Sequence, residues 1–339
     1  MSFLSDIEVM IQMLTEHEIY TQPDDFERLL AFLNDLYIED FARYLFESDV
    51  VYFVGCGSSY YLAVSASKYF SRVTGIDAKP LQSGEVTFAS SFVLGSRDLK
   101  RSAVLISRSG DTTETVQALR KFNQMGIKTF GITLGEKSEL RRICQSSLVL
   151  PLEERSVVMT KSFSCMLLSL FYLIDRMAKI ASDYDRLVRL SRKFLHESEK
   201  SIESQAIDGA KHYVFLGTGV YEGIAKESAL KLQEMSLTFA EAYSTFEYRH
   251  GPKSLVTDQT LVVLYASDQN PEEVTLLGEM QRLGASTVLR TPAAENGQDA
   301  FLQVLFGQLL GLIIAKRKGL NPDQPRNLSR VVFLADESR

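Results

Sequence analysis

Two short stretches rich in hydroxyl groups carry the first candidate chemistry of this sequence. "GCGSS" covers residues 55–59 and "SRSGDTTET" covers residues 107–115. Each follows a short apolar run and precedes a stretch with helical spacing, so both are expected where a strand leads into a helix. The N-terminus of a helix favours an anion, because its N–H groups are free and its dipole is positive there. A phosphate or a polyol would suit this cluster; helix capping alone would explain one or two of the hydroxyls.

A row of charged residues in "AKESALKLQEMS", residues 225–236, is the second candidate. Glu227, Lys231 and Glu234 follow one another at i, i+4 and i+7, so they share one helix face and Lys231 can contact both carboxylates. A partly buried glutamate beside a lysine can act as a general base. The alternative is a solvated row of ion pairs, and the spacing does not decide between the two.

His250 is the third candidate, in "FEYRHGPKSL", residues 246–255. Pro252 fixes one backbone dihedral and disfavours helix at Gly251, so the histidine lies at a rigid corner. Taken alone, the stretch favours an ordinary loop histidine over one that moves a proton.

The elements that must position these residues alternate between strands and helices, which predicts a parallel sheet with helices on both faces. Gly217 and Gly219 lie 162 positions after Gly55 and Gly57, and Ser267 lies 160 after Ser107, which indicates a duplicated α/β domain. Helices are expected over most of residues 1–48, where Ile7, Met10, Ile11, Leu14, Leu29, Leu30, Leu33 and Leu36 recur at helical spacing. The predicted strands are residues 50–54, 102–107, 128–134, 147–152, 212–220, 261–267 and 286–291.

Composition narrows the class of protein. The 339 residues are 45% hydrophobic and 24% charged, as in globular proteins, and the net charge of −6 gives no indication of a nucleic-acid or membrane partner. Three cysteines without metal-ligand spacing predict neither a disulfide framework nor a zinc site. The acidic start is unlike a signal peptide, and the apolar stretches are too short or too interrupted to span a bilayer. We therefore expect a cytoplasmic protein.

Seven ordered motifs together resemble the sugar isomerase (SIS) domain proteins, in particular the double-SIS isomerase module of glucosamine-6-phosphate synthase and the SIS-type glucosamine-6-phosphate deaminases. They are "GCGSS", "SRSGDTTET", "VVMTKSF", "ALKLQEMS", "AEAY", "RHGP" and "DQPRNL". The resemblance implies an α/β fold with two tandem SIS domains, each a parallel sheet flanked by helices in a flavodoxin-like three-layer arrangement. The expected parts are an N-terminal helical segment (1–48), the first SIS domain (49–190), the second SIS domain (205–331) and a C-terminal tail (332–339).

The resemblance also implies roles for individual residues. Glu234 would be the base that moves a proton between C1 and C2 of an open-chain sugar, with Lys231 beside it. His250 would assist ring opening from the neighbouring subunit of a homodimer. No cofactor or metal is implied, and the partner is a small sugar phosphate. The expected substrate-binding residues are Gly57, Ser58, Ser59, Ser107, Arg108, Ser109, Thr112, Val157, Lys161 and Glu227.

Two departures from the synthase pattern narrow the expected reaction. Residues 1–48 are too short for a glutaminase domain and lack a terminal nucleophilic cysteine, and Arg330 stands where the synthase has its imine-forming lysine. Arginine stays protonated and does not form imines in practice. The expected activity is therefore a glucosamine-6-phosphate deaminase. The alternatives are a fructosamine-6-phosphate deglycase, a galactosamine-6-phosphate deaminase/isomerase and a non-catalytic regulatory protein that binds sugar phosphates.

Overall fold

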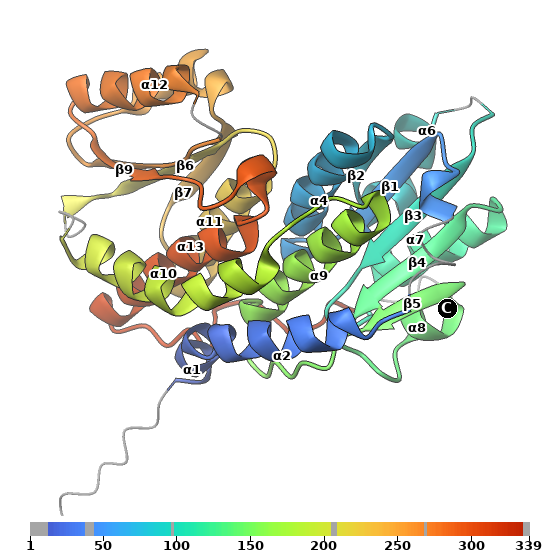
Figure 1. The fold of residues 1–339 in the computed structure, drawn as a ribbon. Coiled ribbons are helices and arrows are strands. Elements are labelled where there is room, and N and C mark those ends of the chain that lie inside the picture. Colours follow the sequence, from blue (N-terminus) through green and yellow to red (C-terminus); the bar gives the residue numbers. More distant parts are fainter. Residues whose placement is uncertain (1–12, 38–43, 96–97, 205–208, 268–269, 335–339) are drawn as a thin grey trace, which may run out of the picture.

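The computed structural model describes residues 13–37, 44–95, 98–204, 209–267 and 270–334. Over these residues the chain forms two lobes, each with a parallel β-sheet flanked by helices, and helices also lead into the first lobe (Figure 1). The predicted fold class is therefore confirmed. The bounds predicted for the separate domains stay a prediction.

The first sheet has the strand order β2-β1-β3-β4-β5, with every pair parallel. Its strands are β1 (Val50–Gly55), β2 (Asp77–Gln82), β3 (Arg101–Ile106), β4 (Lys128–Thr133) and β5 (Ser146–Val149). The helices of this lobe are α4 (Ser58–Thr74), α5 (Ser83–Phe88), α6 (Ser90–Val93), α7 (Thr113–Gln124), α8 (Glu139–Ile143) and α9 (Lys161–Ala178).

The second sheet repeats the first four positions of that order, as β7-β6-β8-β9, again all parallel. Its strands are β6 (His212–Gly217), β7 (Ala240–Ser244), β8 (Thr260–Tyr265) and β9 (Ser286–Arg290). Its helices are α10 (Tyr184–Ser204), α11 (Tyr221–Ser236), α12 (Pro271–Arg282) and α13 (Ala300–Arg317), with short 3-10 turns η2 (Phe246–Arg249), η3 (Pro252–Leu255) and η4 (Glu295–Gly297).

Successive side chains of β1 point to opposite faces of the sheet, and each face is covered by a different layer of helices. Val50, Tyr52 and Val54 pack under α5, α7 and α8, whereas Val51 and Phe53 face α4 and α9. Because both faces are covered, the strand is apolar throughout, as expected of a parallel sheet. The second sheet is covered by α12 on one face and by α11 and α13 on the other.

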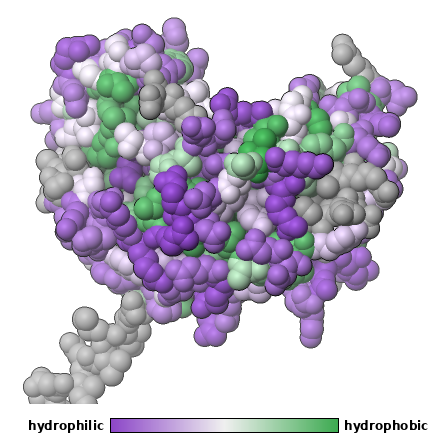
Figure 2. Space-filling model, in the orientation of Figure 1, coloured by the Kyte–Doolittle hydropathy of each residue, from purple (hydrophilic) through white to green (hydrophobic). Residues whose placement is uncertain are grey.

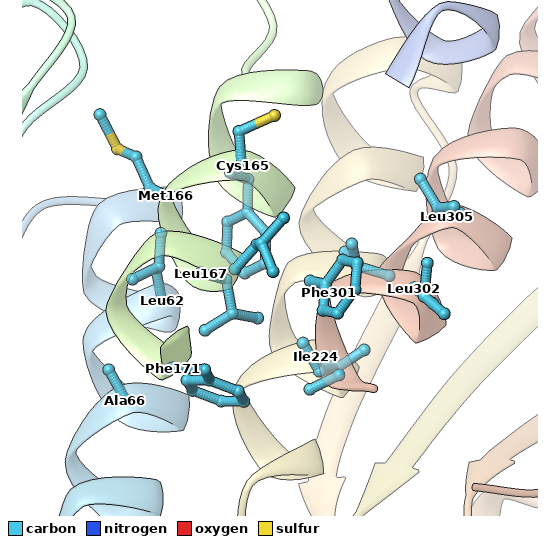
Figure 3. Close-up of a cluster of buried hydrophobic side chains, with 14 of the residues drawn as sticks. Leu62, Ala66, Cys165, Met166, Leu167, Phe171, Ile224, Phe301, Leu302 and Leu305 are labelled. Atoms are coloured by element: carbon cyan, nitrogen blue, oxygen red, sulfur yellow. The ribbon is translucent and has the colours of Figure 1, made fainter. Parts of the chain in front are cut away.

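One hydrophobic core joins the two lobes. Helices α4 and α9 of the first lobe meet α11 and α13 of the second in it (Figure 3). Gly223 lets two of these helices approach closely, because a Cβ there would lie 2.2 Å from Ser65 Oγ and 2.3 Å from the Tyr61 carbonyl oxygen. This close packing places α11 of the second lobe beside the start of α4, where the candidate site lies.

The N-terminal helices are α1 (Leu14–Tyr20) and α2 (Gln22–Asn34), and α2 packs against α9 and α10. Leu29, Leu30 and Leu33 are buried as the helical spacing predicts. The predicted helical positions Ile7, Met10 and Ile11 lie outside the described residues.

Helix α13 is long and apolar enough to cross a membrane by length and composition, but 83% of it is buried inside the protein. It lies between other elements of the fold in Figure 1 and contributes to the shared core. The outer face drawn in Figure 2 is mostly hydrophilic, with small hydrophobic areas, and is hollowed at its upper edge between the lobes. The apolarity of α13 is therefore that of a core helix.

Candidate active site

A cavity of about 220 Å³ lies at the carboxyl ends of β1 and β3, where parallel sheets commonly bind ligands. Five parts of the chain form its wall: the glycine turn (residues 55–59), the hydroxyl loop (107–112) with the start of α7, the 153–160 loop, the closing segment (328–334) near the end of the chain, and Glu234 of α11. The residues that line it are Cys56, Gly57, Ser58, Ser59, Ile106, Ser107, Arg108, Ser109, Thr112, Thr115, Val157, Met159, Glu234, Leu328, Ser329, Arg330 and Val332.

The glycine turn connects β1 to α4 with very little space. A Cβ on Gly55 would lie 2.5 Å from the Ser59 carbonyl carbon, and Gly57 has φ of 52°, a backbone conformation that other residues rarely adopt. The two glycines therefore let the first turn of α4 begin directly behind the strand. Ser58 and Ser59 start that helix and line the cavity.

Three hydroxyl side chains of the hydroxyl loop line the same cavity, namely Ser107, Ser109 and Thr112. Ser107 Oγ accepts a hydrogen bond from the Gly110 N–H at 3.0 Å, and Ser109 Oγ accepts one from the Asp111 N–H at 3.2 Å. Each of these hydroxyls keeps its own proton to donate. Thr112 is the N-cap of α7 but makes no side-chain capping bond. Three O–H donors at one helix N-terminus make a suitable site for a phosphate group.

The charged row of α11 faces this loop across the cavity. Lys231 Nζ lies 2.5 Å from Glu234 Oε2 and 3.1 Å from Glu227 Oε1, so the predicted contacts with both carboxylates are confirmed. The same ammonium donates to Ser58 Oγ at 3.2 Å and to the Met159 carbonyl oxygen at 3.0 Å. Lys231 thus ties the second lobe to two walls of the cavity.

The three charged groups differ in their exposure to solvent. Lys231 and Glu227 are fully buried, whereas the Glu234 side chain is 19% exposed and lines the cavity. Burial raises the pKa of Glu227 to about 7; Lys231 opposes that shift and the Glu234 charge adds to it. Burial lowers the pKa of Lys231, but the two carboxylates outweigh it and leave that pKa above its ordinary value. Lys231 is therefore a fixed cation, and Glu234 is the carboxylate within reach of a ligand.

Arg108 and Val157 lie at the cavity, as predicted, but Arg108 is held by protein groups. It donates to Glu154 Oε2 at 2.9 Å and to the carbonyl oxygens of Ser156, Val157 and Arg330 at 3.2, 2.9 and 3.1 Å. Burial alone would raise the pKa of Glu154, but the charge of Arg108 and hydrogen bonds from Ser162 outweigh it, so that pKa is lowered.

The structure does not bring Lys161 to the cavity. Its ammonium lies 3.4 Å from Asp25 Oδ2 on α2, away from the residues that line the site. Lys161 and the nearby Glu18, which accepts from the Arg155 N–H at 2.6 Å, instead connect the N-terminal helices to the 153–160 loop and α9. Its predicted role in binding substrate therefore has no geometric support within this chain.

His250 is exposed between η2 and η3 and does not line the cavity of its own chain. Gly251, with φ of 126°, makes the corner that follows it, and Pro252 begins η3. This is an open position from which a side chain can reach another molecule, and the role across a subunit interface stays a prediction.

Several lining residues were not predicted, namely Cys56, Ile106, Thr115, Met159 and the closing segment other than Arg330. Cys56, Thr115 and Met159 lie inside the motifs "GCGSS", "SRSGDTTET" and "VVMTKSF", so these motifs already contained the signal that could have found them. Within the part of the chain that the structure describes, no three His, Cys, Asp or Glu side chains are grouped to hold a metal ion. The expectation of metal-free chemistry stays a prediction.

The two parallel sheets and the cavity at the carboxyl ends of β1 and β3 define an α/β protein with a ligand-binding type of site, and comparison with known families identifies its class. The model of the SIS domain matches residues 44–174 and 206–296, so this chain belongs to the SIS domain family. The two matched ranges fall one in each lobe.

Among solved structures, a glucosamine-6-phosphate deaminase from Thermotoga maritima is 39% identical, with a TM-score of 0.84 over 95% of this chain and 100% of that one. Among curated proteins, the isomerizing glutamine–fructose-6-phosphate aminotransferase of Pyrobaculum aerophilum is 30% identical over 93% of this chain, which spans 56% of that relative's length. A tagatose-6-phosphate ketose/aldose isomerase from Escherichia coli shares the fold at 22% identity, with a TM-score of 0.81 over 96% of this chain and 97% of that one.

Proposed function

We propose that this protein is a glucosamine-6-phosphate deaminase, which converts glucosamine 6-phosphate and water into fructose 6-phosphate and ammonia. The observation that carries the proposal is the position of Glu234, whose carboxylate faces the hydroxyl loop across one small cavity. Phosphate binding and acid-base chemistry thus meet at a single site. The similarity to the Thermotoga maritima deaminase supports the same reaction.

The proposed reaction begins with the phosphate on the hydroxyls of Ser107, Ser109 and Thr112 at the start of α7. Glu234 takes the proton from C2 of the open-chain amino sugar while the aldehyde oxygen takes a proton from water, so that an enolamine forms. Glu234 then returns its proton to C1, which leaves a C1 alcohol and a protonated C2 imine. Water adds to C2, the resulting carbinolamine expels ammonia, and the remaining proton returns to solvent. His250 of a second subunit opens the sugar ring in a homodimer.

Lys231 and the groups that bind it hold the Glu234 carboxylate in position for proton transfer. Lys231 holds the Glu234 carboxylate at 2.5 Å and is itself fixed by Ser58 and Met159, so the base has one position. A base held at one place in the ground state loses little freedom in reaching the transition state. Such acid-base catalysis is complete without a metal ion, and activity that survives treatment with EDTA would agree with this expectation.

Arg330 favours deamination over amino transfer. It lines the cavity where the resemblance places an imine-forming lysine, and its guanidinium donates to the Glu154 carbonyl oxygen. A guanidinium stays protonated and does not attack the ketose to form an imine. The reaction that needs no covalent enzyme–sugar bond is the release of ammonia.

A panel of hexosamine and fructosamine phosphates tests the proposal. We expect stoichiometric ammonia and fructose 6-phosphate from glucosamine 6-phosphate, measured with coupled dehydrogenase assays. Galactosamine 6-phosphate, fructosamine 6-phosphates, and fructose 6-phosphate with glutamine or ammonia form the other arms. Absence of ammonia from glucosamine 6-phosphate, in protein shown to be folded, would overturn the proposal. Faster turnover in another arm would reassign the substrate.

A further inference from the structure

Arg108 is the most extensively bonded side chain at the cavity, and its bonds go to the protein rather than into the open space. Its two terminal nitrogens carry four N–H groups, which match its four hydrogen bonds: one to Glu154 and three to main-chain carbonyl oxygens. The guanidinium is buried, with 9% of the side chain exposed.

The four bonds connect three segments that are far apart in the sequence. Arg108 belongs to the hydroxyl loop, while Ser156 and Val157 belong to the 153–160 loop and Arg330 to the closing segment. The closing segment is also bonded to the start of α7: the Thr113 N–H donates to the Val332 carbonyl oxygen at 3.3 Å. Arg330 in turn donates to the Glu154 carbonyl oxygen. Arg108 is therefore the side chain shared by three walls of the cavity.

Glu154 gives this arrangement its rigidity. It is fully buried and accepts from the N–H groups of Thr160 and Ser162 at 2.9 and 3.1 Å as well as from Arg108. If Arg108 turned to a phosphate, the buried carboxylate would lose its counter-charge, which is strongly unfavourable. The position of the guanidinium is thus set before any substrate binds.

We infer that Arg108 is a positioning residue and not a phosphate ligand: it holds the carbonyl oxygens of Val157 and Arg330 in place and so keeps the 153–160 loop and the closing segment around the substrate. The inference rests on the proposed function for the identity of that substrate. It replaces the expectation that Arg108 binds substrate directly, and it leaves phosphate binding to the hydroxyls of Ser109, Thr112 and their neighbours.

The test separates the two roles by two measurements that need no turnover. The first is the dissociation constant of inorganic phosphate by calorimetry, and the second is the rate of tryptic cleavage after Arg330, followed by mass spectrometry. Arg108→Lys keeps a cation beside Glu154 but cannot form the four-bond fork. We expect phosphate affinity within about twofold of native and cleavage about tenfold faster, since a hydrogen bond from a charged group is lost.

Two further variants complete the design. Thr112→Val is the reference for a lost phosphate ligand, with phosphate affinity about tenfold weaker. Arg120→Gln removes an exposed arginine on α7 and should change neither measurement. If Arg108→Lys fails to fold, Arg108→Gln combined with Glu154→Gln removes both buried charges together and keeps the same two measurements possible.

The two measurements distinguish a positioning role of Arg108 from a role as phosphate ligand. Faster cleavage with phosphate affinity unchanged supports the inference, and a fall in kcat of about tenfold on the substrate found by the panel would accompany it. Phosphate affinity that falls tenfold in Arg108→Lys overturns it, whatever the cleavage rate. Cleavage at the native rate overturns it as well. Neither measurement depends on ammonia release, so failure of the proposed function would be seen separately.

Discussion

Glu227 gives the sharpest test of the buried charge row, because its pKa of about 7 predicts how stability depends on pH. In the unfolded chain the carboxyl has its ordinary pKa of 4.5. Below pH 4.5 the carboxyl is protonated in both states. Between pH 4.5 and 7 the folded protein keeps a proton that the unfolded chain loses, so the free energy of unfolding falls as the pH rises. Above pH 7 both states are ionised and the fall ends.

The size of the effect follows from the two pKa values. Each pH unit between them is worth about 1.4 kcal/mol, so the native protein loses about 3 kcal/mol of stability across the interval. Glu227→Gln keeps the shape and does not titrate, so it escapes this loss. Relative to native protein, we expect the variant to gain about 3 kcal/mol between pH 4.5 and pH 8. Lys231 keeps Glu234 as its counter-charge in this variant.

Urea unfolding at pH 4.5, 6 and 8, at one fixed protein concentration, measures the difference between variant and native protein. Exposed Glu85 on α5 provides the control, and its change to Gln should stay within about 0.5 kcal/mol of native at each pH. A Glu227→Gln difference that is constant from pH 4.5 to 8 would refute the reasoning. A variant that loses stability as the pH rises would show that the ion pair with Lys231 outweighs burial.

The remaining predictions concern catalysis. Glu234→Gln should keep its fold by circular dichroism and lose turnover by about 10²- to 10⁴-fold, as expected for a missing general base; native turnover would show that the base lies elsewhere. His250→Ala should slow the reaction, most strongly for the cyclic substrate, as a comparison of ring-closed and freshly opened sugar would measure. If the site is shared across a homodimer, exchanging subunits between these two inactive variants should restore about a quarter of the native sites by random pairing. No recovery after confirmed exchange would count against sharing.

The sequence predicts the central strands well because burial on both faces of the sheet leaves an apolar run in the local sequence. Strands such as β1, β3 and β8 are covered on both faces, and each therefore contains a continuous apolar run. Of the edge strands in the two described sheets, β5 and β9 were predicted and β2 and β7 were not. Strand β2 reads "DAKPLQ" and is half exposed, with Pro80 in its middle, which an edge strand tolerates. Its place is set by pairing with β1, and a local pattern does not contain that information.

In the candidate site, too, some features follow from the local sequence and others depend on tertiary contacts. The contacts of Lys231 with Glu227 and Glu234 follow from helix spacing, and the hydroxyl cluster follows from the two turns. The role of Arg108 does not, because three of its four partners lie about 50 residues away and the fourth lies 222 positions away. The position of Lys161 was also not predictable from its motif, because its ammonium pairs with Asp25 of α2, which is distant in the sequence. Local patterns predict candidate groups, and tertiary contacts decide which of them face the ligand.

The second sheet has the same order as the first four strands of the first sheet, so β8 corresponds to β3. The serine that follows this strand nevertheless has different partners in the two lobes. In the first lobe Ser107 follows β3, and its hydroxyl lines the cavity. In the second lobe Ser267 follows β8, and both its N–H and its hydroxyl donate to Glu273 Oε2, at 2.7 and 3.0 Å. A fully buried carboxylate of the protein thus accepts the hydrogen bonds of Ser267, whereas the equivalent hydroxyl of the first lobe keeps its proton for a ligand. A second anion there would meet like charge in a buried setting, which is costly. The second lobe contributes to the proposed reaction through α11, whose Glu234 reaches the cavity of the first lobe, so that reaction needs both halves of the chain.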